Sequence, residues 1–229
     1  MKPFITLAQT HTADGTELSL HTQDREFYLR ANREPLMGTN ASESEKMLAS
    51  LTCERLRRLP KARVLIGGLG FGFSLGRALE IVGRDAVVHV AELLPEVVAW
   101  NREFLQEVNG ALLQDSRVEV FVEDVLHVLK RGASAPYDAI LLDVDNGPVA
   151  MVQDRNARLY NHHGFTLIKP ALAPGGLVGY WSASKDNAFV KRLNRNGFEV
   201  DAVAVKAYPQ ARRCSHTIYV ARLAEDSGE

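Results

Sequence analysis

Three acidic residues and a cluster of glycines each follow an apolar run with the length of a buried β-strand. The acids are Glu92, Asp124 and Asp143, which follow the runs 86–91, 117–122 and 137–142. The glycines follow the run that begins at Val64, and they are Gly67, Gly68, Gly70 and Gly72. Glycine reaches positive φ without a steric clash, and it lets a ligand lie directly against the backbone. A glycine turn before a helix therefore predicts a nucleotide-like ligand at the unpaired N–H groups of that helix.

The position of Glu92 makes this prediction more specific. Glu92 lies 20 residues after Gly72, at the end of the next apolar run. A carboxylate at this place can accept hydrogen bonds from both hydroxyls of a ribose. The same spacing is also typical of nicotinamide-dependent oxidoreductases, but the third glycine of their G-x-G-x-x-G turn is replaced here by Phe73. The residues thus favour a nucleoside ligand over a nicotinamide dinucleotide.

Strands and helices alternate from Arg63 onward, which predicts a parallel sheet with helices on both faces. Helices are expected over 74–82, 95–109, 125–131, 156–172 and 186–196, and a fifth strand over 177–181. In doubly wound sheets ligands bind at the carboxyl ends of the strands, so the glycine turn and the three acids should line one crevice. Each acid alone also has a structural interpretation: Glu92 or Asp124 as a helix cap, and Asp143 as a loop acid. Their convergence favours a binding site.

Both ends of the chain depart from this alternation. The runs 17–21 and 26–30 predict a small antiparallel β unit, which is too small to be stable alone. We therefore expect two domains, residues 1–40 and 41–229. The capping-box pattern from Ser42 to Glu45 predicts a helix to about Arg58, with Glu45 as a structural cap. The last two runs, 198–206 and 216–222, have no helix between them and predict an antiparallel pair at one edge of the sheet.

Composition narrows the classes of partner. The chain has 229 residues, of which 46% are hydrophobic, and a formal net charge of -1 without a basic stripe. A large core is therefore expected, and nucleic acid is not indicated as a partner. Cys53 and Cys214 lie far apart, and the sequence shows no signal peptide or membrane-spanning run, which favours a cytoplasmic protein with free thiols and no membrane partner. The histidines have no ligand spacing, so no metal site is predicted.

The pattern from Val64 to Arg222 resembles the S-adenosylmethionine-dependent methyltransferase fold, and the chain more closely resembles the spermidine synthase (polyamine aminopropyltransferase) family within it. The resemblance covers nearly the whole chain, including the N-terminal β unit and the segment Met37–Leu48. The implied fold class is α/β: a Rossmann-like, mostly parallel doubly wound sheet with an antiparallel edge strand.

The resemblance also assigns roles to residues. Gly67, Gly68, Gly70 and Gly72 would lie against the sulfonium nucleoside, Glu92 would hold the ribose, and Asp124 would bind the adenine amine. Asp143 matches the catalytic acid that the family places beside the attacking amine. Asp145, Asn146 and Tyr208 fall in the region that binds the substrate in this family, and Tyr208 with the following Pro209 resembles its aromatic-proline stretch. The implied co-substrate is S-adenosylmethionine or its decarboxylated form, and the acceptor is a small amine such as a polyamine. Because the N-terminal β unit is too small to stand alone, we also expect it to contribute to a homodimer.

Two positions depart from the family pattern. The glycine turn of the family reads Gly-Gly-Gly-Asp-Gly-Gly, and its Asp holds the amine of the aminopropyl group; that position is Gly70 here. A second family acid falls on Asn146, next to Asp145. Because an acid at position 70 would repel the carboxylate of intact S-adenosylmethionine, Gly70 makes methyl transfer to an unknown small molecule an alternative. A non-catalytic nucleoside-binding regulatory protein is the alternative of another class.

The expected chemistry is attack by a nucleophile on a carbon bonded to a sulfonium. Because the positive charge already activates that carbon, the protein must mainly align the reactants and keep the nucleophile deprotonated. Asp143, helped by Asp145, would accept a proton from an incoming amine. Trp181 and Tyr180, at the end of the fifth strand, are candidate walls of the acceptor pocket, with burial in the core as the alternative for both.

Overall fold

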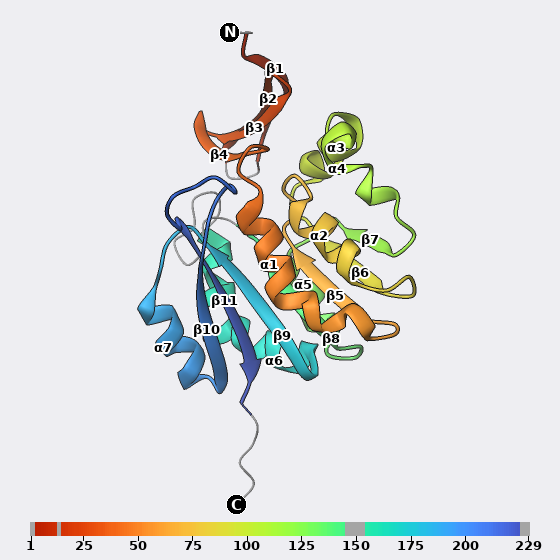
Figure 1. The fold of residues 1–229 in the computed structure, drawn as a ribbon, viewed down its shortest axis with the longest axis vertical. Helices are drawn as coiled ribbons and strands as arrows, with labels where there is room; N and C mark the ends of the chain where they lie inside the picture. Colours follow the sequence, from red (N-terminus) through yellow and green to blue (C-terminus); the bar gives the residue numbers. More distant parts are fainter. Residues whose placement is uncertain (1–2, 13–14, 145–153, 225–229) are drawn as a thin grey trace, which may run out of the picture.

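The computed structural model describes residues 3–12, 15–144 and 154–224. Its larger sheet has seven strands in the order β10-β11-β9-β8-β5-β6-β7 (Figure 1). These strands are β5 (Arg63–Gly67), β6 (Val87–Ala91), β7 (Val118–Phe121), β8 (Tyr137–Leu142), β9 (Leu172–Ser182), β10 (Phe198–Val205) and β11 (His216–Leu223). The five strands from β7 to β9 are parallel, and β11 is antiparallel to both β9 and β10. The predicted fold class, including the antiparallel pair at one edge, is confirmed.

Helices cover both faces of this sheet because its central strands are apolar on both sides. One face packs against α1 (Glu43–Cys53), α2 (Phe73–Ile81) and α3 (Pro95–Glu103), and the other against α5 (Val125–Gly132), α6 (His162–Ala171) and α7 (Asn187–Arg195). Figure 1 shows α1 and α2 in front of the sheet and α5 and α6 behind it. Short helices complete the chain: η1 (Glu54–Arg58), α4 (Gln106–Asn109), η2 (Leu112–Gln114) and η3 (Asp154–Tyr160).

The N-terminal residues form a separate four-stranded antiparallel sheet. Its strands are β1 (Ile5–His11), β2 (Glu17–Gln23), β3 (Glu26–Ala31) and β4 (Glu34–Gly38), where the sequence pattern predicted only two runs. Leu18, Leu20 and Leu29 of this sheet are buried against Phe71 and Leu105 of the larger unit. The small sheet is therefore stabilised by contact with the main body.

Two predicted helices differ from the observed ones. The helix predicted over 95–109 ends at Glu103, and α4 starts after Leu105, whose side chain is buried beneath the N-terminal sheet. The N–H groups of Phe104 and Leu105 both bond to the Trp100 carbonyl, which marks the break. The helix predicted over 156–172 begins only at His162, after the 3₁₀ turn η3 and a side-chain cap from Asn161.

The strand predicted over 177–181 is longer than expected. β9 starts at Leu172 and continues through the Pro-Gly-Gly segment. The pairing register with β8 shifts at this segment, since Tyr137 pairs with Leu172 but Ala139 pairs with Leu177. Within the part of the chain that the structure describes, no helix is long and apolar enough to cross a membrane.

Candidate functional site

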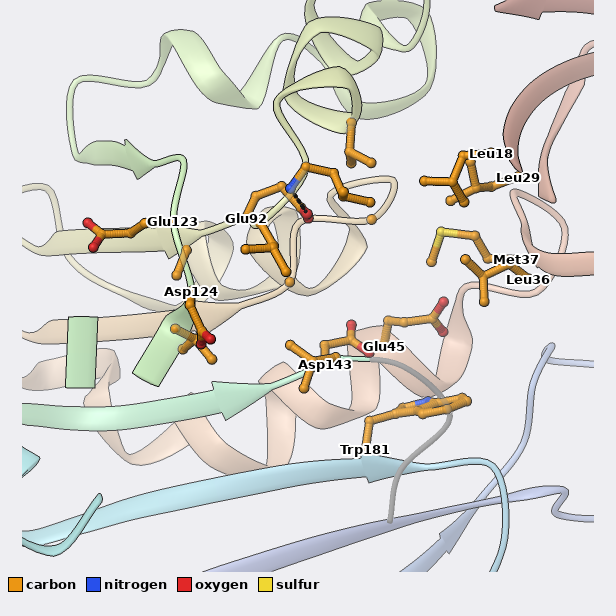
Figure 2. Close-up of a pocket in the computed structure, with 18 residues that line it drawn as sticks. Leu18, Leu29, Leu36, Met37, Glu45, Glu92, Glu123, Asp124, Asp143 and Trp181 are labelled. Atoms are coloured by element: carbon orange, nitrogen blue, oxygen red, sulfur yellow. Dashed lines mark hydrogen bonds between the residues drawn. The ribbon is translucent and has the colours of Figure 1, made fainter. Parts of the chain in front are cut away.

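A pocket lies at the carboxyl ends of five neighbouring parallel strands, and the N-terminal sheet forms one of its walls (Figure 2). The chain crosses from β7 to β8 over β5, so the pocket lies at the switch point where doubly wound folds bind ligands. Its lining residues are Leu18, Leu29, Leu36, Met37, Glu45, Gly68, Gly70, Ala91, Glu92, Leu93, Leu94, Val97, Glu123, Asp124, Val125, Asp143, Val144 and Trp181. The predicted convergence of the glycine turn with the three acids is found here.

The four predicted glycines divide into two pairs. Gly68 and Gly70 line the pocket, both with positive φ (+89° and +50°). A Cβ on Gly68 would overlap the carbonyl oxygen of Asp143, so only glycine lets the turn approach that strand end. Gly67 and Gly72 are outside the pocket lining. A Cβ on Gly67 would lie 2.9 Å from Val125, and Gly72 is the N-cap of α2 with φ +83°.

Gly70 has an unexpected neighbour from the N-terminal sheet. A Cβ at this position would lie 2.8 Å from Cε of Met37, at the end of β4. The place where the resemblance expects an acidic side chain is therefore bordered by a thioether side chain. The sequence pattern contained no indication of this contact, because Met37 and Gly70 belong to different sheets.

Glu92 is buried, and two backbone N–H groups hold its carboxylate. Oε2 accepts a hydrogen bond from Leu69 of the glycine turn, and Oε1 accepts one from Leu94, the N-cap of α3, both at 2.9 Å. Burial raises the pKa of Glu92, and these hydrogen bonds oppose the rise. The backbone N–H groups of Leu93 and Gly70 also act on this carboxylate. Glu92 thus shapes the turn and also lines the pocket.

Asp124 also both caps a helix and lines the pocket. Its Oδ1 accepts a hydrogen bond from the Leu126 N–H at 2.9 Å, so it is the N-cap of α5, as the structural interpretation predicted. It also lines the pocket. The neighbouring Glu123 lines the pocket too, but its carboxylate is paired with the Arg131 guanidinium at 2.8 Å.

Asp143 and Glu45 lie close together on the opposite side of the pocket, above Trp181 in Figure 2. Asp143 Oδ2 accepts a hydrogen bond from Ser74 Oγ at 2.8 Å, and Ser74 Oγ also lies 3.2 Å from the Glu45 carbonyl oxygen. Burial raises the pKa of Asp143 to about 6. Burial, and then the nearby Asp143, raises the pKa of Glu45 to about 7. Two adjacent carboxyl groups therefore hold protons more tightly than usual.

The prediction of Glu45 as a structural cap is wrong. Ser42 has helical backbone angles (φ -98°, ψ -4°) and forms no side-chain cap bond, so the reciprocal pair of a capping box is absent. Glu45 instead accepts a hydrogen bond from Ser44 Oγ at 2.6 Å and lines the pocket, with 7% of its surface exposed. The capping pattern is local, whereas the pocket position depends on where α1 meets the sheet.

The remaining predicted residues have different outcomes. Asp145 and Asn146 lie outside the described residues. Tyr208 is 48% exposed and is not among the residues that line the pocket. Trp181 lines the pocket, and its buried Nε1–H has no partner among the described residues, whereas Tyr180 is fully buried in the core. In the same described part of the chain, no group of three or more His, Cys, Asp or Glu side chains could hold a metal ion.

Sequence comparisons relate this chain to one family. The family model for the spermine/spermidine synthase domain matches residues 45–205. A polyamine aminopropyltransferase of Mycobacterium tuberculosis (strain ATCC 25618 / H37Rv) is 35% identical over 118 residues, which cover 50% of this chain and 21% of that protein. A polyamine aminopropyltransferase of Prochlorococcus marinus (strain AS9601) is 24% identical over 127 residues, which cover 56% of this chain and 43% of that protein. These matches span less than half the length of either relative.

Solved structures agree on the fold. Spermidine synthase from Thermotoga maritima has a TM-score of 0.72 at 15% identity, over 95% of this chain and 72% of that one. A spermidine synthase structure in complex with the transition state analogue AdoDATO gives the same values. Human methyltransferase-like protein 13, in complex with SAH, has a TM-score of 0.58 at 18% identity, over 81% of this chain and 82% of that one.

Proposed function

The chain belongs to the spermine/spermidine synthase family, and on that premise we propose that it transfers an aminopropyl group from decarboxylated S-adenosylmethionine to a small amine such as a polyamine. The observation that carries this proposal is the contact between the glycine turn and Asp143, where Gly68 leaves no room for a Cβ beside the Asp143 carbonyl oxygen. A nucleoside on the turn would thus lie next to a buried carboxyl group.

In this proposal one half of the pocket holds the nucleoside. The backbone of Gly68 and Gly70 borders the sulfonium, Glu92 accepts hydrogen bonds from the ribose, and Asp124 accepts one from the adenine amine. The buried, backbone-fixed carboxylate of Glu92 supports its role, because it needs no rearrangement to accept two hydroxyl hydrogen bonds.

The other half of the pocket would carry the reaction. The acceptor amine attacks the aminopropyl carbon bonded to sulfur, a C–N bond forms, the C–S bond breaks, and methylthioadenosine leaves with the electron pair. Asp143 accepts the proton that the amine nitrogen loses. Its pKa of about 6 leaves this carboxyl group largely ionised at neutral pH, and the Ser74 hydroxyl orients it. No nucleophilic residue of the protein is needed, since the sulfonium is already an activated leaving group.

Methyl transfer from intact S-adenosylmethionine is a second candidate. It is favoured by Gly70, which removes the acid that would repel the carboxylate of the intact donor. Human methyltransferase-like protein 13 shares the fold of this chain, so the fold is compatible with either donor.

Product analysis separates the two candidates. The protein is incubated with each donor and with a panel of diamines and polyamines, and the nucleoside product is identified by mass spectrometry. Aminopropyl transfer predicts methylthioadenosine and an acceptor enlarged by one aminopropyl group. Formation of S-adenosylhomocysteine from the intact donor would support methyl transfer, and binding of a nucleoside without either product would support a regulatory protein.

We further propose that the N-terminal sheet contributes to a homodimer. Ile5 is the first residue of the edge strand β1 and is 50% exposed, and the preceding Phe4 is 39% exposed. Such exposure is expected for apolar residues that a second copy would cover. Light scattering at micromolar concentration tests this: a monomeric full-length protein would contradict it. Deletion of residues 1–38 is expected to reduce the mass of the assembly and to weaken acceptor binding.

A further inference from the structure

Two adjacent carboxyl groups of the pocket have no cationic partner among the described residues; Glu92 and Asp124 have none either, but backbone N–H groups of neighbouring residues hold their carboxylates. Neither Glu45 nor Asp143 forms an ion pair in this part of the chain, whereas the pocket residue Glu123 is paired with Arg131. Lys46, the nearest base to Glu45 along the chain, is paired with Glu43 at 3.2 Å. A buried acid without a cation is unfavourable when ionised, so this side of the pocket is suited to a ligand that brings positive charge.

The orientation of Glu45 distinguishes it from Asp143. Asp143 is directed toward Ser74, whereas the Glu45 carboxyl group points toward Met37 in Figure 2. Met37 is the side chain that borders Gly70. Glu45 Oε2 accepts the Ser44 hydrogen bond at 2.6 Å, and the backbone N–H of Glu45 also acts on this carboxylate. Glu45 therefore brings a carboxyl group into the pocket that the glycine turn lines, although the turn itself carries no acid.

We propose that Glu45 is a specificity-determining residue that binds the terminal ammonium of the aminopropyl group, in place of the carboxylate that the turn lacks at Gly70. This inference rests on the proposed function, because it requires the sulfonium nucleoside to lie on the glycine turn. The carboxylate would come from the first turn of helix α1 and not from the glycine turn, and it would present the same negative charge to the ligand.

The electrostatics of the pocket agree with this role. The charged and polar groups that act on Glu45 are Asp143 across the pocket and Ser44 and Lys46 on its own helix; Ser74 acts on Asp143. Burial raises the pKa values of both acids, the nearby Asp143 raises that of Glu45 further, and a bound ammonium would favour the ionised form of both. The carboxylate of intact S-adenosylmethionine would instead face two acids. The pair therefore selects the decarboxylated donor.

Calorimetric titration tests the inference at pH 7.5 with three probes: decarboxylated S-adenosylmethionine, intact S-adenosylmethionine, and methylthioadenosine, which lacks the ammonium. Glu45→Gln removes the charge and keeps the shape. We expect it to weaken binding of the decarboxylated donor roughly 10- to 100-fold, the range for hydrogen bonds to a charged group. Its affinity for methylthioadenosine is expected to stay within twofold, which also shows that the variant is folded.

Two further variants sharpen the result. Glu54→Gln, an equal loss of charge at the exposed position that follows α1, is the matched control and should change none of the three affinities. Glu45→Asp keeps the charge on a shorter side chain and should recover part of the lost affinity. Titration in two buffers of different ionisation enthalpy should show that the decarboxylated donor releases protons from the unmodified protein, and fewer from Glu45→Gln.

The outcomes separate this inference from the proposed function. If the unmodified protein transfers aminopropyl groups and Glu45→Gln binds the decarboxylated donor within twofold of it, the role of Glu45 is wrong and the function stands. An equal loss of methylthioadenosine affinity in Glu45→Gln also contradicts an ammonium-specific role. Preference of the unmodified protein for the intact donor would overturn both the role and aminopropyl transfer.

Discussion

The two halves of the pocket hold their carboxyl groups by different means. In the half that we propose to bind the nucleoside, Glu92 and Asp124 accept hydrogen bonds from backbone N–H groups of Leu69, Leu94 and Leu126. In the acceptor half, Asp143 and Glu45 accept theirs from the hydroxyl groups of Ser74 and Ser44. Backbone donors are fixed by the strands and helices that carry them, whereas a hydroxyl group can rotate. The first half is therefore organised before any ligand binds.

The two halves of the pocket also differ in what controls the ionisation of their carboxyl groups. The backbone hydrogen bonds of Glu92 favour its ionised form and oppose the effect of burial on its pKa. On the other side of the pocket, the Ser74 hydrogen bond lowers the pKa of Asp143, and Ser44 and the Glu45 backbone N–H lower that of Glu45, but burial still raises the two values to about 6 and about 7. We infer that the fold itself organises the half proposed to bind the nucleoside, while the other half is suited to a positively charged ligand.

The strongest test of this division is Asp143→Asn. Loss of the proton acceptor should lower turnover about 10²- to 10⁴-fold, the usual range for a positioned acid or base, while methylthioadenosine affinity stays within a few-fold. Steady-state kinetics with the identified acceptor and calorimetry of the nucleoside measure the two effects. Normal turnover of the folded variant would mean that Asp143 is a loop residue only.

Gly68→Ala acts where the two halves meet. The new methyl group would overlap the Asp143 carbonyl oxygen, and the residue would have to keep φ near +89° or shift. We expect a loss of about 2–4 kcal/mol in the free energy of unfolding, from backbone strain and overpacking. Urea denaturation measures it. Gly83→Ala is the control, because a Cβ there meets nothing within 4 Å; equal stability of the two variants would exclude a close contact at Gly68.

Glu92→Ala tests the nucleoside half alone. It should weaken nucleoside binding by about 1.5–3 kcal/mol, the range for hydrogen bonds to a charged group, and leave the chain folded. The variant also leaves the N–H groups of Leu69 and Leu94 without their acceptor, so a smaller loss of stability is expected. Calorimetry should detect the change in affinity, and an unchanged value in a folded variant would rule out the ribose role.

The smallest expected effect is the dependence of stability on pH. The pKa values of Glu45 and Asp143 rise from ordinary values of 4.5 and 3.8 to about 7 and about 6 in the folded state. Between these limits the folded protein binds more protons than the unfolded chain, so these groups lower stability as pH rises from about 4 to about 7. Burial lowers the pKa of His21, His89 and His216, and these residues act in the opposite direction.

Comparison with a variant isolates the contribution of the acid pair. The unmodified protein should lose roughly 2–4 °C more in Tm than Glu45→Gln between pH 5 and pH 7.5. Both proteins contain the same histidines, so their effect cancels in the difference. Parallel Tm curves would show that Glu45 ionises normally in the folded protein.

The sequence by itself determined the sheet and one edge of the pocket. Apolar runs at 64–67, 86–91 and 137–142 predicted parallel strands, and acids directly after strands predicted Glu92, Asp124 and Asp143 at one site. These predictions succeeded because they depend on local patterns and one general rule. Residues at the carboxyl ends of parallel strands converge whatever the details of packing.

Only the tertiary structure decided which other residues reach the pocket. Glu45 matches a local capping pattern, and its place beside Asp143 depends on how α1 packs against the sheet. Met37 borders Gly70 because the N-terminal sheet folds over the main body, and the buried Leu105 breaks the helix predicted over 95–109 for the same reason. Such contacts join segments that are distant in sequence, and packing determines them, whereas sequence spacing contains no information about them.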